Sequence, residues 1–585
     1  MTAWLQHEPT AVHLLRRYAD ERGSGEAVRF IHDHDAAEGW AALSFGQLDA
    51  EARRIASWLQ DRGATGDRVM LLHPPGLSFV TAFLGCVYAG AIAVPAPMPG
   101  QFQHQRRRAT GMAHNAGAGI ALTDTRQLAD ADRWIGGQET RVRAWASDTP
   151  DFGDAGAWRE PDVTGDDAVL LQYTSGSTGN PKGVVVRHQH LLHNAASLGR
   201  SLGLDEHTRF GGWVPLYHDM GLMGQLLPGL FLGGGAVLMS PMAFLKRPYH
   251  WLATIDRHDV NYSAAPDFAY GMCVRKVTDS QLASLDLSRW RCAVNGSEPI
   301  QAATLRAFAE RFASAGFRPE SLAPSYGMAE ATVFVSGRTG RSPVITTVDA
   351  AALEKHEVQP VADSGSPTRD LVGCGDAADF DVLIVEPDSG RPLEDRGVGE
   401  IWLRGSSVTG EYWESPDATA VTFEARTTDG DGPYLRTGDM GAVVDGELYV
   451  TGRIKELLIV HGRNLYPQDL EHELRLQHPE LSNLAGAAFG VHAPEENVVV
   501  VHEIRGNFDE PRLRGLTSLM RATISREFGV RVAGIVLVRP GTVQKTTSGK
   551  VQRSLMRQLF LANELTPLVA DLDPALREAT VWNAP

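Results

Sequence analysis

Cysteine is scarce in this sequence, and long apolar runs are absent. The four cysteines, Cys86, Cys273, Cys292 and Cys374, lie far apart along the 585 residues and show no paired spacing. A reduced intracellular protein is therefore favoured over a disulfide or zinc framework. Residues 1–22 carry several charged side chains and no apolar run long enough for a secretory signal, which predicts a cytoplasmic location.

The longest stretch without a charged residue, residues 74–100, is not typical of a membrane span. Prolines crowd both of its ends, at positions 74, 75, 95, 97 and 99. A spanning helix needs roughly 20 consecutive apolar residues, whereas this stretch divides into a predicted buried helix over 79–88 and a predicted strand over 91–94. We therefore expect no stable insertion into a membrane.

Basic residues are fewer than acidic residues. The chain carries 55 Lys and Arg against 71 Asp and Glu, which gives a formal net charge of −16. Nucleic acid and anionic membrane surfaces would be repelled at long range, so neither is expected as the main partner. From residue 455 onward the two signs balance, which places the negative excess in the preceding part of the chain.

One segment near the C-terminus departs from this acidic character. Residues 511–560 contain a single acidic residue, Glu527. Such a run indicates either an anionic partner or an ordinary solvated face. Its basic residues are Arg512, Arg514, Arg521, Arg526, Arg531, Arg539, Lys545, Lys550, Arg553 and Arg557.

Length and pattern predict an α/β fold with at least two domains, because one domain usually holds roughly 100–200 residues. Short runs of Val, Ile and Leu alternate with amphipathic stretches in the first part of the chain, which is typical of βα units around a mostly parallel sheet. From about Asp381, short strands and turns predict a small β-barrel-like portion. A new α/β rhythm follows Arg453, so we expect a large domain over 1–453 and a small mobile domain over 454–585.

The strongest chemical signal is a loop rich in glycine and hydroxyl residues between two predicted strands. Glycines let the backbone approach phosphate oxygens, hydroxyls donate hydrogen bonds, and Lys182 supplies positive charge. The pattern is not Walker A, because Pro181 stands where that motif has its second glycine and Gly183 follows the lysine. A flexible surface hairpin is the alternative, but it would not need a lysine. The loop contains Thr174, Ser175, Gly176, Ser177, Thr178, Gly179 and Lys182.

This loop resembles the phosphate loop of the adenylate-forming superfamily, which includes acyl-CoA synthetases, luciferases, peptide-synthetase adenylation domains and fatty acyl-AMP ligases. Further stretches resemble the signatures of that family, in the family's order along the chain, and together they exclude coincidence. They are Gly296-Ser297-Glu298-Pro299, Ser325-Tyr326-Gly327-Met328-Ala329-Glu330, Tyr434 to Asp439, Thr451-Gly452-Arg453 and Lys545 to Lys550.

The resemblance implies how these residues meet ATP. The turn at 296–299 would lie on the adenine side, and Tyr326 would stack on the adenine. Asp439 would accept hydrogen bonds from the ribose hydroxyls, a role that suits an ionised carboxylate, and Arg453 would lie near the ribose or the phosphates. Glu330 would hold Mg²⁺, which needs oxygen ligands and shares them with substrate phosphates.

The C-terminal signature implies that Lys550 is the catalytic lysine, which the small domain brings in by turning about a hinge at Lys455. Two positions depart from the family pattern. Many relatives have threonine where Ala329 stands and proline where Gln544 stands. The first departure removes one phosphate contact, which we interpret as a difference between branches. The second is expected only to loosen the turn before Lys550.

Several segments resemble the fatty acyl-AMP ligases in particular, namely residues 213–222, 238–241, 265–270 and 463–469. In that group an insertion in the large domain is thought to hinder the domain rotation that CoA needs. The candidate here is the stretch from Arg338 to Cys374, which is rich in Ser, Pro, Gly, Asp and Glu and shows little periodicity. Long loops of this kind are usually functional or disordered. An ordinary variable loop is the alternative.

A fatty acid needs a mostly apolar binding cavity. The candidate wall residues fit plain core equally well, and they are Met220, Leu222, Met223, Leu226 and Phe268. His218 is expected beside the carboxylate or at the mouth of the adenylate site, with a structural histidine bonded to a backbone carbonyl as the alternative.

The resemblance implies activation of a fatty acid by ATP and Mg²⁺ to acyl-AMP, followed by transfer to the phosphopantetheine thiol of an acyl carrier protein. Carrier proteins are typically acidic, so the basic run from Arg512 to Arg557 is the expected docking site. An acyl-CoA synthetase shares every ATP-side signature and is the first alternative. A nucleotide-binding homologue that has lost catalysis is the second.

Overall fold

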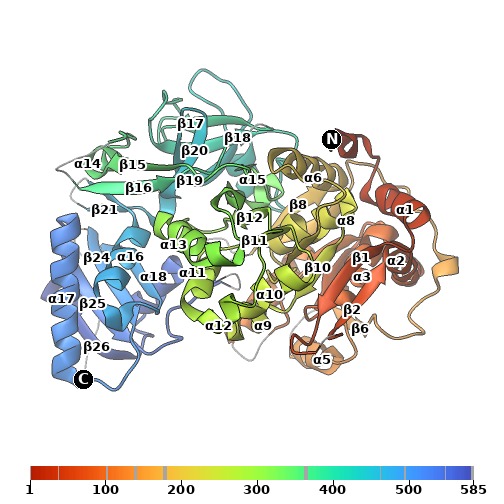
Figure 1. The fold of residues 1–585 in the computed structure, drawn as a ribbon, viewed down its shortest axis with the longest axis horizontal. Helices are drawn as coiled ribbons and strands as arrows, with labels where there is room; N and C mark the ends of the chain where they lie inside the picture. The colour runs from red at the N-terminus through yellow and green to blue at the C-terminus, as the bar shows by residue number, and fades with distance from the viewer. Residues whose placement is uncertain are drawn as a thin grey trace.

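A computed structural model of the chain provides the coordinates. It shows a mixed α/β protein with several sheets, as predicted. Figure 1 shows the antiparallel sheet of the middle of the chain above the two large sheets, and the C-terminal part as a separate lobe at the left. The residues described are 2–36, 38–99, 103–137, 141–174, 181–361, 367–377, 379–460, 463–492, 496–546 and 549–580.

The first large sheet contains six strands in the order β6-β5-β3-β4-β7-β8. Its strands are parallel except at β7 and β8, which form an antiparallel pair joined by the glycine-rich loop. The expectation that this loop joins two strands is thus confirmed. The elements are β3 (Arg68–Leu71), α3 (Leu77–Ala89), β4 (Ile92–Pro95), α4 (Gln103–Ala116), β5 (Ile120–Thr123), α5 (Leu128–Gly136), β6 (Arg143–Ala146), β7 (Ala168–Thr174) and β8 (Lys182–Arg187).

The uncharged stretch at 74–100 forms a buried helix and a strand, as expected. Helix α3 is apolar on all sides, and every residue from Phe79 to Ala89 is buried, which is typical of a helix inside a large core. The helix ends at Gly90, whose φ of +67° gives the left-handed cap that glycine adopts without strain. Among the described residues, no helix is both long enough and apolar enough to cross a membrane.

The second large sheet has eight strands in the order β14-β13-β12-β11-β9-β10-β1-β2. Its central strands run parallel, so their carboxyl ends meet along one edge, where ligands bind in open α/β sheets. The strands are β1 (Glu26–Ile31), β2 (Trp40–Ser44), β9 (Phe210–Gly212), β10 (Ala236–Met239), β11 (Tyr262–Ala265), β12 (Cys292–Asn295), β13 (Leu322–Tyr326) and β14 (Ser336–Gly337).

Helices cover this sheet and connect its strands. Helix α2 packs against α3 of the first sheet, so the two sheets share one core. The helices are α1 (Ala11–Glu21), α2 (Phe45–Gln60), α6 (His188–Ser201), α7 (Asp219–Gly221), α8 (Leu227–Leu232), α9 (Pro241–Lys246), α10 (Tyr249–Arg257), α11 (Asp267–Lys276), α12 (Asp279–Leu282) and α13 (Ala302–Phe312).

The middle of the chain forms antiparallel strands, as predicted from about Asp381. The expectation of an irregular stretch over 338–374 was wrong in part, because this stretch contains two paired strands and a short helix. Polar composition hid them, since their side chains are only partly buried. The elements are β15 (Ile345–Asp349), α14 (Ala350–Glu354), β16 (Thr368–Val372), β17 (Asp381–Val385), β18 (Gly399–Arg404), α15 (Pro416–Phe423), β19 (Leu435–Val444) and β20 (Glu447–Arg453).

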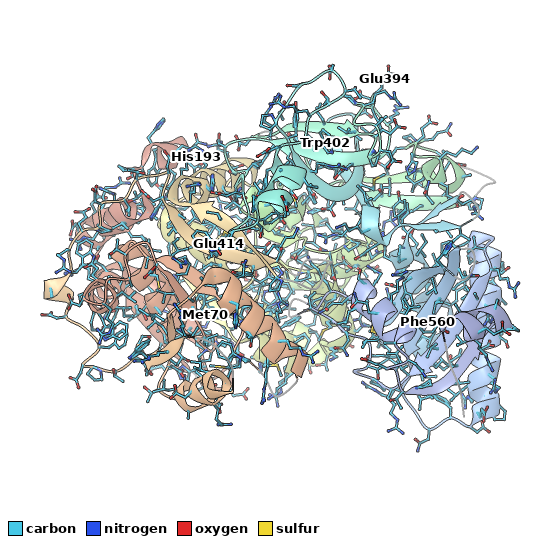
Figure 2. The ribbon with its side chains drawn as sticks, turned by 180° about the vertical axis from the view of Figure 1, so that it is seen from behind. Met70, His193, Glu394, Trp402, Glu414 and Phe560 are labelled. Atoms are coloured by element: carbon cyan, nitrogen blue, oxygen red, sulfur yellow. The ribbon has the colours of Figure 1, made fainter. Side chains whose placement is uncertain are left out.

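The C-terminal part has its own apolar core on the two faces of a four-stranded sheet, β23-β24-β25-β26. Phe560 belongs to this core, whereas Met70 and Trp402 mark separate cores in earlier parts of the chain (Figure 2). The elements are β21 (Leu458–Val460), β22 (Arg463–Leu465), α16 (Pro467–Gln477), β23 (Gly486–His492), β24 (Glu496–Glu503), α17 (Glu510–Phe528), β25 (Val532–Val538), α18 (Arg553–Leu561), β26 (Pro567–Leu572) and α19 (Pro574–Thr580).

Candidate active site

One large cleft lies between the C-terminal part and the rest of the chain, with a volume of about 2890 Å³. Single-ligand cavities usually measure roughly 300–1,000 Å³, so this cleft has room for more than one substrate. It brings together most of the residues predicted for the site, and those that line it are Thr174, Lys182, His218, Gly296, Ser297, Glu298, Pro299, Ser325, Tyr326, Gly327, Met328, Ala329, Glu330, Asp439, Arg453, Lys455 and Lys550.

The described residues on both sides of the glycine-rich loop line the cleft. Thr174 and Lys182 are opposite each other in the β7–β8 ladder, so both ends of the loop are fixed by backbone pairing. The Lys182 Nζ atom lies 4.9 Å from the centre of the Tyr412 ring, within range of a cation–π interaction. The predicted phosphate-binding residues between them, Ser175, Gly176, Ser177, Thr178 and Gly179, lie outside the described residues.

Glu330 is buried, and its carboxylate is held by one hydroxyl. The Tyr412 hydroxyl donates a 2.8 Å hydrogen bond to Glu330 Oε1. Thr409 holds the same residue from the backbone side, because its amide and hydroxyl both donate to the Glu330 carbonyl at 2.9 and 3.0 Å. Burial raises the pKa of Glu330, and the Tyr412 hydrogen bond opposes that shift. A cation beside this carboxylate would offset the free-energy cost of burying its negative charge.

The Glu330 environment fits Mg²⁺ that takes most of its ligands from phosphates and water. Among the described residues, no group of three or more His, Cys, Asp or Glu side chains could hold a metal ion. A dedicated protein cage is therefore not formed there. Mg²⁺ usually binds through one or two carboxylates together with substrate phosphates, which one buried carboxylate can satisfy.

Tyr326, Asp439 and Arg453 form a connected group at one side of the cleft. The Tyr326 hydroxyl donates to Asp439 Oδ2 at 2.7 Å, and Arg453 Nε lies 3.0 Å from Asp439 Oδ1. The register of β19 and β20 explains this arrangement, because Asp439 and Arg453 are directly opposite in the ladder. Asp439 raises the pKa of Arg453, which burial alone would lower. The group presents a fixed carboxylate and a fixed guanidinium to a ligand.

The turn after β13 requires glycine at position 327, because the backbone of Val333 leaves no room for a side chain there. A Cβ atom added to Gly327 would lie 1.7 Å from the Val333 carbonyl oxygen. No side chain fits at that distance, so the backbone can bring Tyr326 and Glu330 to the same cleft only with glycine between them.

The turn after β12 is strained and ends in a half-buried acid. Ser297 has a φ of +70°, and such conformations of non-glycine residues concentrate at functional sites. Glu298 Oε1 accepts a 2.7 Å hydrogen bond from the Phe268 amide. Burial, reinforced by the neighbouring Asp267 carboxylate, raises the pKa of Glu298 to about 7.

His218 is paired with an acid that sequence reasoning did not single out. Its Nδ1 lies 2.6 Å from Asp219 Oδ1. Burial alone would raise the pKa of Asp219, but the charge and hydrogen bond of His218 outweigh it and hold that pKa at about 2. The structural alternative, a bond to a backbone carbonyl, is not what this ring forms among the described residues. His218 lines the cleft and is oriented by Asp219.

Lys550 reaches this cleft from the C-terminal part of the chain. Burial lowers the pKa of its ammonium group, and the Arg453 guanidinium adds to the shift. Carboxylates nearby oppose it, namely Asp219, Glu298 and Asp439. The Lys550 ammonium therefore interacts electrostatically with residues that are expected around ATP.

The predicted acyl wall divides into two groups. Met220 and Phe268 line the cleft. Leu222, Met223 and Leu226 are at most 3% exposed and belong to the main core, where they form one π-helical turn. For these three residues the structure agrees with the alternative of plain core. Apolar side chains suit both an acyl-binding wall and a plain core, so the sequence could not distinguish the two roles.

Several basic residues of the run at 511–560 form ion pairs within the described part of the chain. The compensating acids lie mostly outside that segment, which is why counting charges within it missed them. Arg557 instead donates to the Gly490 carbonyl. The ion pairs are Arg514 with Glu510, Arg521 with Asp571, Arg526 with Glu527, Arg531 with Asp573, and Arg553 with Glu456 and Glu471.

Comparison with known proteins agrees with this geometry. The AMP-binding enzyme family matches residues 15–413. The chain is 37% identical over 568 residues to the medium-chain-fatty-acid–[acyl-carrier-protein] ligase JamA of Moorena producens, covering 95% of this chain and 96% of that protein.

Two solved structures from Legionella pneumophila are similar over nearly their full length. A fatty acid AMP ligase has a TM-score of 0.76 and 34% identity, covering 98% of this chain and 99% of that one. A fatty acyl-adenylate ligase in complex with acyl adenylate and pyrophosphate has a TM-score of 0.75 and 34% identity, covering 97% and 99%. The chain therefore belongs to the AMP-binding enzyme family, within the group that contains the fatty acyl-AMP ligases.

Proposed function

We propose that this protein activates a fatty acid with ATP, forming acyl-AMP and pyrophosphate, and then passes the acyl group to the phosphopantetheine thiol of an acyl carrier protein. The observation that carries the proposal is the convergence of Lys550 with Glu330, Asp439 and Arg453 on one cleft. Membership of the AMP-binding enzyme family, together with relatives named as ligases of fatty acids, supports the choice of substrates.

In the first half-reaction a carboxylate oxygen attacks the α-phosphorus of ATP, and the bond to the bridging oxygen of pyrophosphate breaks. The protein's contribution is positioning and electrostatic stabilisation. Asp439 accepts hydrogen bonds from the ribose hydroxyls, and Lys182 places positive charge at the phosphates. Lys550 donates to the oxygens where negative charge accumulates between the carboxylate and the α-phosphate.

Glu330 would hold Mg²⁺ in this scheme. When bound, the ion neutralises phosphate charge and orients the leaving pyrophosphate. The 2.8 Å hydrogen bond from Tyr412 favours the ionised form of the Glu330 carboxylate and fixes its direction. Lys182 contacts the same tyrosine ring, so Tyr412 links the acid that would bind the metal to the lysine that would bind phosphate.

The C-terminal part would act as a small mobile domain with a hinge at Lys455, just after β20. Contacts with the stretch at 338–374 would favour the arrangement that places Lys550 in the cleft. Arg463 forms a bidentate pair with Glu354 at 2.7 and 2.8 Å, and Arg369 pairs with Asp469 at 3.0 Å. If these ion pairs hinder rotation of the C-terminal part, they would disfavour free CoA, which needs that rotation. They therefore support the proposed preference for a carrier-bound thiol.

Carrier docking would use the basic residues that stay uncompensated. Arg512 and Arg539 form no ion pair with any described residue, and both are exposed. Reversing both charges should weaken acyl transfer and spare adenylation. An exposed electrostatic contact is screened by salt, so transfer that is unchanged between low and high ionic strength would reject docking through these residues.

The test of the function is mass spectrometry of the products. The protein is incubated with ATP, Mg²⁺ and a panel of fatty acids, alone, with CoA, or with a phosphopantetheinylated carrier protein. We expect acyl-AMP in the absence of a thiol and acyl-carrier thioester in the presence of the carrier. Acyl-CoA as the main product would identify an acyl-CoA synthetase, and nucleotide binding without any product would identify a silent homologue.

A further inference from the structure

Gly549, the residue that precedes Lys550, packs directly on the ring of Phe268. A Cβ atom added to Gly549 would lie 2.7 Å from Cε1 and 3.2 Å from Cζ of Phe268, and its three nearest heavy atoms all belong to this ring. Gly549 also has a φ of +92°, a conformation that favours glycine. The residue before the catalytic lysine is therefore constrained both by its backbone and by one aromatic side chain of the large domain.

Phe268 is itself held in place on the large-domain side. Its amide donates to Glu298 Oε1 at 2.7 Å. The preceding residue, Asp267, accepts from Asn295 at 2.9 Å and from Thr304 at 2.9 Å, which fixes the start of α11. The backbone at Phe268 thus has little freedom to move away from the Gly549 loop.

The Phe268 ring also belongs to an aromatic cluster. It lies 6.0 Å from the Trp213 ring and 6.4 Å from the Phe244 ring, measured between ring centres, and those two rings stack on each other at 4.0 Å. Such pairs prefer these offset and edge-on arrangements. The Trp213 and Phe244 rings therefore restrict movement of the Phe268 ring on the side where they lie.

The same ring faces the cleft where the acid is proposed to bind. Other apolar residues that line the cleft with Phe268 are Trp213, Met220, Leu245 and Met272. An alkyl chain in this part of the cleft would pack on the ring from one side, while the Gly549 loop packs on it from another.

We propose that Phe268 is a positioning residue for Lys550 and, at the same time, a determinant of acyl-chain selection. The reason is that one ring packs against Gly549 and also forms part of the wall of the proposed acid site. The proposal rests on the proposed adenylation activity. It goes beyond that activity in linking recognition of the acid to placement of the lysine through a single side chain.

An alanine at position 549 would both strain the backbone and crowd the Phe268 ring. A second glycine with a similar φ but no neighbour allows the two effects to be separated. Gly541 has a φ of +87° but no heavy atom within 4 Å of an added Cβ. The variants G541A and G549A therefore introduce similar backbone strain, and only G549A crowds Phe268. Adenylation is followed by ATP–pyrophosphate exchange with a saturating fatty acid, and ATP binding is measured by calorimetry.

We expect G549A to lower the adenylation kcat by about 10²-fold, since misplacing a reacting group by about 1 Å has that effect, while ATP binding changes little. G541A should keep adenylation within a few-fold of the wild type. The double variant F268A/G549A should be about tenfold faster than G549A, because removing the ring relieves the overlap. F268A should not improve G541A.

F268A alone should lower kcat and also broaden chain selection, so that the ratio of kcat/KM between long and short acids changes. F268L, which keeps an apolar side chain, serves as a second variant if F268A folds poorly. A double variant no faster than G549A, or G541A as slow as G549A, would overturn the proposal. Absence of exchange activity in the wild type would instead reject the proposed function itself.

Discussion

Replacing Tyr412 with phenylalanine tests the link between Glu330 and Lys182 with the smallest chemical change. The substitution removes one hydroxyl, which donates the 2.8 Å hydrogen bond to Glu330 Oε1, and keeps the ring over which Lys182 lies. A hydrogen bond to a charged group contributes about 1.5–3 kcal/mol. Since about 1.4 kcal/mol corresponds to a factor of ten, Y412F should lower adenylation kcat/KM by about 10- to 100-fold.

The loss should depend on pH in a defined direction. Burial raises the pKa of Glu330, and the Tyr412 hydrogen bond lowers it. Removing the hydroxyl therefore raises this pKa further, and the carboxylate becomes protonated at a higher pH as the solution is acidified. The acid limb of the pH–rate profile should move to higher pH in Y412F, with the largest loss of activity at low pH.

The assay is ATP–pyrophosphate exchange from about pH 5 to 8, the range in which folded proteins tend to be most stable. Y434F is the matched control, because the Tyr434 hydroxyl also donates to carboxylates, those of Asp381 and Asp431, but Tyr434 does not line the cleft. Equal losses in Y412F and Y434F, or a Y412F profile that is lowered without any shift in pH, would refute the reasoning.

Three further substitutions address the other parts of the site. Lys550→Ala should lower the adenylation rate by about 10²–10³-fold, as loss of one oxyanion donor does, with ATP binding retained; wild-type exchange by this variant would reject the role of the lysine. Asp439→Asn should raise KM for ATP on the order of tenfold through the loss of a charged acceptor for the ribose, and an unchanged KM would remove Asp439 from the nucleotide site. Arg553→Met removes the ion-pair partner of the buried Glu471 and of the half-buried Glu456, so urea unfolding should show a loss of about 3–5 kcal/mol; a loss below about 1 kcal/mol would contradict the importance of these ion pairs.

The parallel sheets could be predicted because their strands are short apolar runs separated by helical stretches. The helix predicted over 79–88 and the strand predicted over 91–94 match α3 (Leu77–Ala89) and β4 (Ile92–Pro95) to within two residues at each end. The paired strands within 338–374 escaped prediction, because half-exposed strands in a polar segment lack the apolar alternation that marks the others.

The residues that converge on the cleft could be named from local signatures, since each of them lies in a short segment of recognisable composition. Tyr412 was missed because it lies 82 residues from Glu330 and in none of those segments. Nothing in its local sequence indicates that its hydroxyl meets a buried carboxylate. The same limit applies to Phe268 and Gly549, whose contact depends on how the two parts of the chain meet.

Charge counts along a segment do not reveal which basic residues are paired in the folded chain. The run at 511–560 contains one acid, yet Arg521 and Arg531 find partners at Asp571 and Asp573, and Arg553 finds Glu471. Sheet and helix packing brings these acids in from other elements. Net charge over a segment therefore describes a surface only after the fold is known.

Oxygen-18 transfer tests the central claim most directly. A fatty acid labelled with oxygen-18 in both carboxylate oxygens is incubated with the protein, ATP, Mg²⁺ and a phosphopantetheinylated carrier protein, and the nucleotide product is analysed by mass spectrometry. If the carboxylate attacks the α-phosphorus and the thiol then displaces AMP, the AMP carries one oxygen-18 atom for each thioester formed. Unlabelled nucleotide, or label in inorganic phosphate with ADP as the product, would contradict the account.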